Sequence, residues 1–150
     1  MSSTLEFTSK ISFKKSRKDA FSYLREVKNR KAFMHIVDET TVTLKPKGKS
    51  QQGMRFKEVT HFMGFDMTLE YEMTQFILDE KIEVKCSDGP FYPVMNIKLT
   101  GDAADKSKAE VSVSLHKGPL SLMPEFLLKP AVEKIISSIL DNLVKCVNAS

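Results

Sequence analysis

The sequence predicts an α+β fold in which a curved antiparallel sheet of six or seven strands wraps around one long C-terminal helix. Three features of the 150-residue chain lead to this prediction. Apolar and polar residues alternate through most of residues 40–117, as they do in consecutive strands with one buried face. A first strand and two short helical patterns precede this region. One long amphipathic helical pattern follows it.

The N-terminal part is predicted to contain a strand from about residue 5 to residue 14, followed by two short helices. Four apolar residues of one parity mark the strand: Leu5, Phe7, Ile11 and Phe13. Ser16, followed three residues later by Asp19, is typical of a capping box that opens a helix. The second short helix is expected from about Asn29 to Val37. The sequence therefore places both short helices directly after the first strand.

The central region is predicted to be a meander of six strands. Its clearest member carries apolar residues of a single parity: Phe65, Met67, Leu69, Tyr71 and Met73. The residues between them are polar, which leaves little room for a helix. Further strands are expected at residues 40–45, 54–62, 82–86, 91–100 and around 111–115. Turn-forming sequences such as Met63-Gly64 and Ser87-Asp88-Gly89-Pro90 separate several of them.

The last element is predicted to be a long helix with an apolar stripe that includes Val132, Ile135, Ile139 and Leu143. Proline is unfavourable inside a helix, so we expect this helix to begin near Pro130 or to kink there. The preceding segment, residues 118–129, contains two prolines and several apolar residues. We expect it to form part of an entrance gate.

These elements predict a gap between the helix and the concave face of the sheet. A helix is about 10 Å across with its side chains, whereas a twisted sheet of this many strands is wider. Two outcomes stay open: side chains fill the gap as an ordinary core, or an apolar pocket remains. The residues expected to contact a ligand in such a pocket are Phe56, Phe65, Met67, Leu69, Tyr71, Met73, Phe91, Met95, Ile97, Phe126, Leu127, Ile135 and Ile139.

Charge is distributed unevenly along the chain. Residues 1–57 contain 14 Lys/Arg and 5 Asp/Glu, a net charge of +9, whereas residues 58–150 contain 9 and 14, a net charge of −5. Two interpretations stay open: a solvated surface, or a basic face that makes transient contact with an anionic membrane. The candidates for that face include Lys14, Arg25, Arg30, Lys31 and Lys49. Nucleic acid is not expected as a partner, since no exposed aromatic residues are interleaved with these cations.

The order and spacing of several segments resemble a known family. They are Ser16–Leu24, Gly53–Thr60, the glycine at 64, Tyr71–Thr74, Gly89-Pro90 and the final helix with Leu140, Leu143 and Lys145. Together they resemble the START-like helix-grip superfamily (SRPBCC), in its polyketide cyclase/dehydrase and lipid-transport branch. The resemblance implies one START-like ligand-binding domain over residues 1–150. It also implies a cavity for a hydrophobic molecule such as a lipid, isoprenoid or polyketide.

Binding, with transport of the ligand, is the function expected from the sequence; a cyclase or dehydratase that uses the same cavity is the alternative. No carboxylate–histidine pair is predicted to face inward, and Tyr71 is the best inward polar group on the strands. No catalytic residue is therefore assigned. His35, His61 and His116 are scattered without ligand spacing, so neither a metal nor a cofactor is expected.

The cellular context is predicted from the N-terminus and the cysteines. The first residues lack the apolar core of a signal peptide. Cys86 and Cys146 show no redox or metal spacing, which favours free thiols in a reducing compartment, with a disulfide as the alternative. We therefore expect a cytoplasmic protein. No feature of the sequence indicates its oligomeric state.

Overall fold

The computed structural model describes residues 3–150, and in this part of the chain seven antiparallel strands form one sheet in the order β1-β7-β6-β5-β4-β3-β2. The strands are β1 (Thr4–Phe13), β2 (Val37–Leu44), β3 (Arg55–Phe62), β4 (Phe65–Ile77), β5 (Lys81–Asp88), β6 (Val94–Thr100) and β7 (Ser107–His116). Strands β2 to β7 form a meander, and β1 pairs with β7 at one edge. The predicted meander and its additional N-terminal strand are confirmed.

Two short helices follow β1, as predicted: α1 (Arg17–Leu24) and α2 (Arg30–Phe33). A 3-10 turn, η1 (Val27–Asn29), lies between them. The backbone N–H of Asp19 donates to Ser16 Oγ at 3.1 Å, which is the predicted cap of α1. The expectation that the second helix reaches Val37 is wrong. The chain leaves the helix after Phe33, and a turn closed by Val37 N–H and the Met34 carbonyl leads directly into β2.

The long helix α3 extends from Glu125 to Ala149 and follows a short 3-10 turn, η2 (Gly118–Leu120). It begins five residues before Pro130, so the expected start near that proline is wrong. Pro130 lacks the N–H that would donate to the Phe126 carbonyl. Both residues are exposed, so water can supply the missing donor and the helix continues through the proline.

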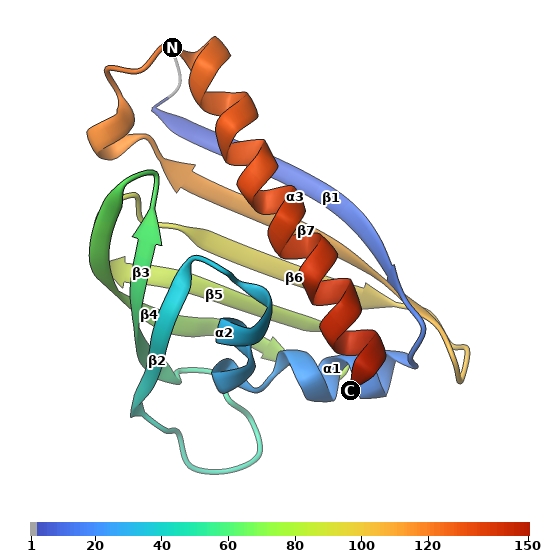
Figure 1. Cartoon of the computed structure of the whole chain (residues 1–150). Helices are drawn as coiled ribbons and strands as arrows, with labels where there is room; N and C mark the ends of the chain where they lie inside the picture. Colours follow the sequence, from blue (N-terminus) through green and yellow to red (C-terminus); the bar gives the residue numbers. More distant parts are fainter. Residues whose placement is uncertain (1–2) are drawn as a thin grey trace.

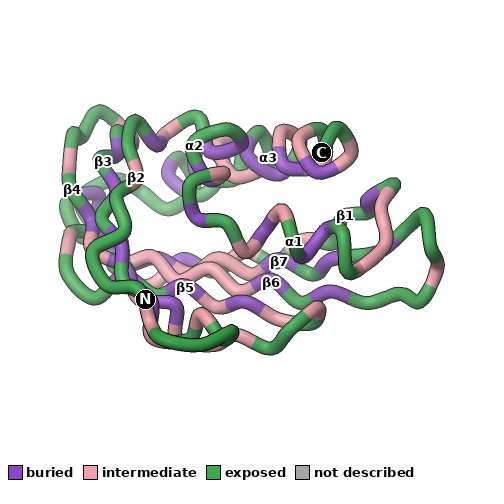
Figure 2. Tube along the Cα trace, turned by 90° about the horizontal axis from the view of Figure 1, so that it is seen from below, coloured by how far each residue is buried: buried purple, intermediate pink, exposed green. Residues whose placement is uncertain are grey.

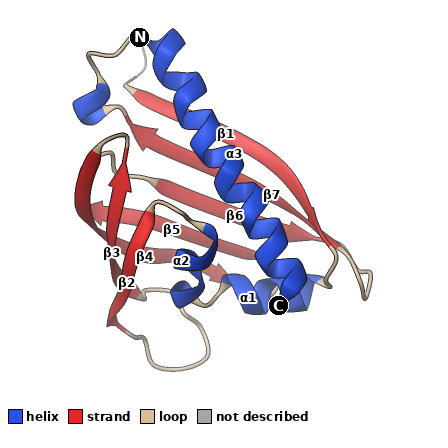
Figure 3. Ribbon diagram, in the orientation of Figure 1, coloured by secondary structure: helices blue, strands red, loops and turns tan. Residues whose placement is uncertain are grey.

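The helices lie on one face of the sheet (Figure 1). Helix α3 runs diagonally across the concave side, and α1 and α2 lie at the end of α3 that holds the C-terminus (Figure 3). Figure 2 shows β5, β6 and β7 as a floor below α3, with β2, β3 and β4 rising at one side. This curvature makes the sheet a shallow cradle for the helix. No helix in residues 3–150 is long and apolar enough to cross a bilayer.

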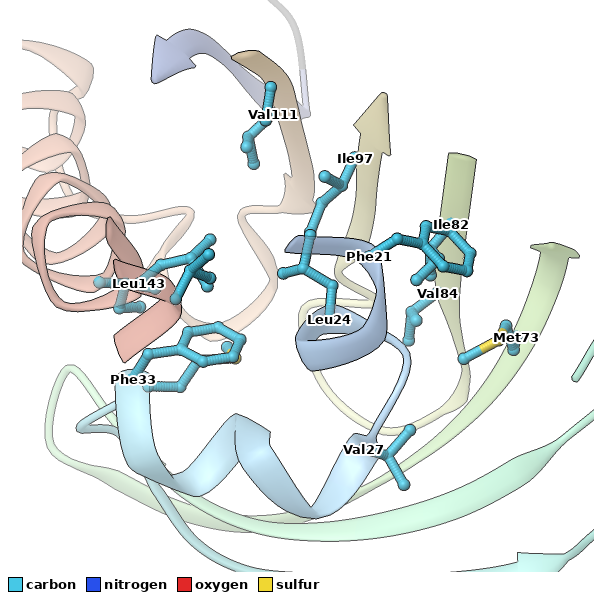
Figure 4. Packing of buried hydrophobic residues seen from close by; sticks show 14 of the residues in the cluster. Phe21, Leu24, Val27, Phe33, Met73, Ile82, Val84, Ile97, Val111 and Leu143 are labelled. Atoms are coloured by element: carbon cyan, nitrogen blue, oxygen red, sulfur yellow. The ribbon is translucent and has the colours of Figure 1, made fainter. Parts of the chain in front are cut away.

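The buried apolar side chains form two clusters at opposite ends of α3. The larger packs α1, α2 and the C-terminal half of α3 against the sheet, and Figure 4 shows Phe21, Phe33 and Leu143 among its members. The smaller joins the N-terminal half of α3, through Leu128 and Val132, to the other end of the sheet. Five half-buried residues contact both clusters: Ile36, Met67, Val113, Ile135 and Ile136. The two clusters therefore meet at the middle of the helix.

Candidate ligand-binding cavity

A cavity of about 90 Å³ lies between α3 and the concave face of the sheet. It is lined by α2 and the turn after it, by β3 and β4, by the loop before β6, by β6 and β7, and by α3. The lining residues are Arg30, Met34, Ile36, Val37, Glu58, Thr60, Phe62, Met67, Leu69, Tyr71, Phe91, Pro93, Val94, Met95, Val113, Leu115, Val132, Ile135, Ile136, Ile139 and Leu140.

The position of the cavity follows from the two-cluster core. All five residues that contact both clusters line it. Side chains of the two clusters pack between α3 and the sheet toward both ends of the helix, and the cavity lies between the clusters. The space predicted from the width of the sheet is therefore present at the middle of α3.

Several of the residues predicted to contact a ligand are brought together around this space. They are Met67, Leu69, Tyr71, Phe91, Met95, Ile135 and Ile139. Their strand parity or helix phase accounts for this position: residues 67, 69 and 71 alternate inward along β4, and residues 135 and 139 lie one turn apart on α3.

Three predicted residues are buried in the packed core beside the cavity instead. Phe56 is buried at the far end of β3, where its ring stacks on Tyr71 with centroids 5.2 Å apart. Met73 and Ile97 point inward as expected, but they lie under α1 and α2, in the larger cluster (Figure 4). All three side chains are on the inner face of the sheet, as predicted from their parity. They lie at positions along their strands that face the packed core and not the cavity.

Phe65, Phe126 and Leu127 do not line the cavity. Phe65 begins β4 and is 38% exposed, with its ring edge-on to Phe91 at 5.9 Å. Phe126 and Leu127 are 76% and 54% exposed, which corrects the expectation that they face inward. The helix already includes both residues, and its buried face passes through Leu128. At 100° per residue, the two preceding side chains point away from that face.

Four polar residues of the lining form what we call the polar cluster: Arg30, Glu58, Thr60 and Tyr71. Of these four, only Tyr71 is expected in the cavity from the sequence. Arg30 is expected on the basic face, but it is 6% exposed, which corrects that expectation. The inward position of Glu58 and Thr60 could have been predicted from the alternation along β3, because both share the parity of Phe56 and Phe62.

The centre of the polar cluster is a buried ion pair between α2 and β3. Arg30 Nε donates to Glu58 Oε2 at 2.5 Å, and Nη2 donates to Oε1 at 3.0 Å. The hydroxyl of Thr40 on β2 also donates to Glu58 Oε2, at 3.1 Å. The guanidinium carbon lies 5.3 Å from the ring centroids of both Phe56 and Tyr71. Two aromatic faces and two charge-assisted hydrogen bonds thus hold the guanidinium in place.

The ionisation states in the polar cluster are set by burial and by this ion pair. Burial raises the pKa of the Tyr71 hydroxyl far above its usual value, more than the nearby Arg30 cation lowers it. Burial alone would lower the pKa of Arg30, but the adjacent Glu58 carboxylate outweighs that effect and the pKa is raised. Tyr71 is therefore a neutral hydroxyl and Arg30 a cation across the physiological range.

Hydrogen-bonding capacity remains unused in the polar cluster. Thr60 is 4% exposed, and its hydroxyl has no hydrogen-bond partner within residues 3–150. Arg30 donates to Glu58 through Nε and Nη2. A buried hydroxyl without a partner is costly and uncommon in a folded protein. The cavity therefore offers donors to a group placed inside it.

The loop between β5 and β6 closes one side of the cavity. Phe91 and Tyr92 have φ angles of 69° and 40°, in the left-handed region that few non-glycine residues adopt. Two backbone hydrogen bonds hold this loop: His116 N–H to the Phe91 carbonyl at 2.7 Å and Cys86 N–H to the Pro93 carbonyl at 2.9 Å. The Phe91 ring packs edge-on to Phe62, with centroids 5.3 Å apart. Phe91 is thus held at the apolar end of the space.

The histidines and cysteines of residues 3–150 do not line the cavity. Among residues 3–150, no group of three or more His, Cys, Asp or Glu is arranged to hold a metal ion. His35, His61 and His116 are all exposed, and His61 lies 3.1 Å from Asp38 on the surface. Cys86 and Cys146 are free thiols, as predicted. The cavity is therefore the site that remains to be explained.

No protein-family model and no curated protein sequence matches the chain. Solved structures do. The aromatase/cyclase Zhui from Streptomyces sp. R1128 superposes with a TM-score of 0.77 at 9% identity, over 96% of this chain and 93% of that one. A START superfamily protein from Mycobacterium smegmatis gives 0.74 at 11%, over 96% and 94%. Ara h 8.0201 gives 0.67 at 14%, over 98% and 99%.

The fold and the cavity define a helix-grip protein, in which a curved antiparallel sheet holds a long C-terminal helix. Within that class, the chain has the START-like (SRPBCC) fold that the sequence predicted, since START superfamily and aromatase/cyclase structures align with almost its whole length.

Proposed function

We propose that the protein binds and transports a hydrophobic small molecule, such as a lipid, isoprenoid or polyketide, in the cavity between the sheet and α3. The observation that supports this most directly is an apolar space with a buried, partly unsatisfied polar cluster in its wall. Ligand sites are commonly apolar hollows with a few polar groups that fix orientation. Residues 1–150 would then form a single ligand-binding domain.

The cavity must enlarge to accept such a ligand. Its volume of about 90 Å³ is below the roughly 300–1,000 Å³ of typical ligand pockets. Three methionines line it, Met34, Met67 and Met95, and their unbranched side chains repack at low cost. The ligand would take the place of these side chains as they rotate toward the core. The sequence left open that side chains fill the gap between the helix and the sheet. In this proposal, that filled gap is the closed state of the same site.

The geometry supports binding better than cyclisation or dehydration. Tyr71 stays protonated because burial raises its pKa, so it is not a base near neutral pH. Arg30 is already paired with Glu58. If a cyclase activity exists, Tyr71 is the group that would donate a proton or a hydrogen bond. Tyr71→Phe would then remove most of the turnover with little loss of ligand affinity.

We also propose two features of the setting in which the ligand is handled. Lys14, Lys31 and Lys49 of the basic face are exposed, so they are available for transient contact with an anionic membrane during delivery. Co-sedimentation with anionic vesicles that does not change with salt would contradict this contact. The two free thiols support a cytoplasmic location, which cell fractionation can test.

Native mass spectrometry of the freshly purified protein, followed by organic extraction, tests for a ligand carried from the cell. Displacement of the neutral fluorescent probe phenylnaphthylamine then tests the cavity itself. Met95→Trp should fill the space and abolish probe binding. Val59→Trp is the matched control, because Val59 lies on the outer face of β3 and is 39% exposed. Equal probe binding by Met95→Trp and by the unmodified protein would contradict the proposed site.

A further inference from the structure

We infer that the cavity selects apolar molecules whose polar end is neutral, such as an alcohol, a ketone or an ester, over molecules that end in a carboxylate. The inference rests on the proposed function and specifies the chemistry of the ligand. Its basis is the charge balance and the free hydrogen-bonding groups of the polar cluster.

The charge balance argues against an anionic ligand. Arg30 and Glu58 are the charged residues of the lining, and they neutralise each other in a two-point ion pair. A carboxylate entering the cavity would add an uncompensated negative charge to an apolar space, which is strongly unfavourable. A cavity containing Arg30 alone would have the opposite preference.

A ligand carboxylate cannot easily take the place of Glu58 on Arg30. Glu58 is 1% exposed and also accepts a hydrogen bond from Thr40. Its displacement would leave its own charge buried without a partner. The guanidinium is fixed as well, since the rings of Phe56 and Tyr71 lie 5.3 Å from its central carbon. The ion pair is therefore part of the wall.

The free groups of the polar cluster suit a neutral oxygen. The Thr60 hydroxyl is buried without a partner in residues 3–150, and it can both donate and accept. The Tyr71 hydroxyl belongs to the same lining and is held neutral by burial. An alcohol, ketone or ester oxygen can accept a hydrogen bond from such a donor without adding a charge to the cavity. An alcohol also offers a proton to Thr60.

The strand register shows how the polar end would be oriented. Thr60 lies opposite Met67, Glu58 opposite Leu69 and Phe56 opposite Tyr71, all on the inner face of β3 and β4. The far side of the cavity is formed by apolar residues such as Leu115 and Val132. The ligand would thus place its oxygen against β3 and its apolar part against β7 and α3.

Calorimetric titration with decanol, methyl decanoate and decanoate at about pH 8 tests the inference. We expect the two neutral molecules to bind at least about tenfold more tightly than decanoate. Thr60→Val should weaken decanol binding by about five- to tenfold, and Thr60→Ser should restore it. Thr68→Val is the control, because Thr68 is exposed on the outer face of β4; it should leave decanol binding unchanged.

A second variant tests the charge balance directly. Glu58→Gln leaves the Arg30 charge unpaired and should invert the preference, so that decanoate binds more tightly than decanol. If this variant fails to fold, the decanol affinities of the Thr60 variants still test the inference. Equal or tighter binding of decanoate by the unmodified protein, or an unchanged decanol affinity in Thr60→Val, would overturn the inference but not the proposed function. Absence of binding for all three molecules and for phenylnaphthylamine would overturn both.

Discussion

The Arg30 guanidinium and the Glu58 carboxylate form a two-point ion pair, with Nε 2.5 Å from Oε2 and Nη2 3.0 Å from Oε1. The pair joins a four-residue helix, α2, to the central part of β3. Both side chains are almost completely buried, at 8% and 1% exposure. Removal of one partner would leave the other as an unpaired charge in the core.

We therefore predict that Arg30→Met and Glu58→Leu each lower the free energy of unfolding by about 3–5 kcal/mol. The double variant should recover much of this loss, because no unpaired charge remains in it. Denaturant titrations of the four proteins give the coupling energy directly. Additive losses would show that the two residues act independently, contrary to the geometry.

Gly89 lies against the cavity wall at Leu69. A Cβ on residue 89 would come 2.3 Å from Leu69 Cδ2, and the φ angle of 142° is one that other residues rarely adopt. Gly89→Ala should therefore destabilise the fold by about 1–3 kcal/mol and push Leu69 into the cavity, which weakens ligand binding. Gly48→Ala is the control, since its φ is also positive, at 93°, but nothing lies within 4 Å. An equal loss of ligand affinity in both variants would contradict the role of the contact.

Tyr71 should make the protein sensitive to alkali. Burial raises its pKa above the 10.0 of an unperturbed tyrosine, so its contribution to stability is fully present below that pH. Above it, the unfolded chain loses the proton first, and the stability contribution is lost as the pH rises toward the folded-state pKa. Stability measured from neutral pH to about pH 11 should fall less steeply in Tyr71→Phe than in the unmodified protein. Parallel curves would argue that Tyr71 ionises freely in the folded state.

The first turn of α3 offers a contrast between adjacent positions. Leu127 is 54% exposed, whereas Leu128 is fully buried. Leu128→Ala should lower the free energy of unfolding by about 2–5 kcal/mol, and Leu127→Ala by less than about 0.5 kcal/mol. Thermal unfolding of the two variants checks the helix phase. A large loss of stability in Leu127→Ala would show that Leu127 points inward, as expected from the sequence.

The fold could be predicted from the sequence because its strands are strongly periodic. The alternation from residue 65 to residue 73 identifies β4 and its inner face, and the cap at Ser16 identifies the start of α1. Both depend on neighbouring residues alone. The start of α3 was missed because proline is generally unfavourable inside a helix, yet this helix continues through Pro130 at an exposed position.

The candidate site was only partly predictable because it depends on contacts distant in sequence. Parity placed Leu69 and Tyr71 in the lining, but it also selected Met73, which the packed core surrounds. Arg30 belongs to the inner wall only because Glu58, 28 positions away, faces it. Whether a gap is filled also depends on the curvature of the whole sheet, which no local pattern contains.

The measurement that tests the central claim most directly is an NMR titration of protein labelled at the methionine methyl groups, with decanol as the ligand. The account predicts large shifts for Met34, Met67 and Met95, which line the cavity. The signals of Met63 and Met123, which lie outside it, should stay in place. Shifts confined to Met63 or Met123, or no saturable shift at any methionine, would contradict an apolar ligand site between the sheet and α3.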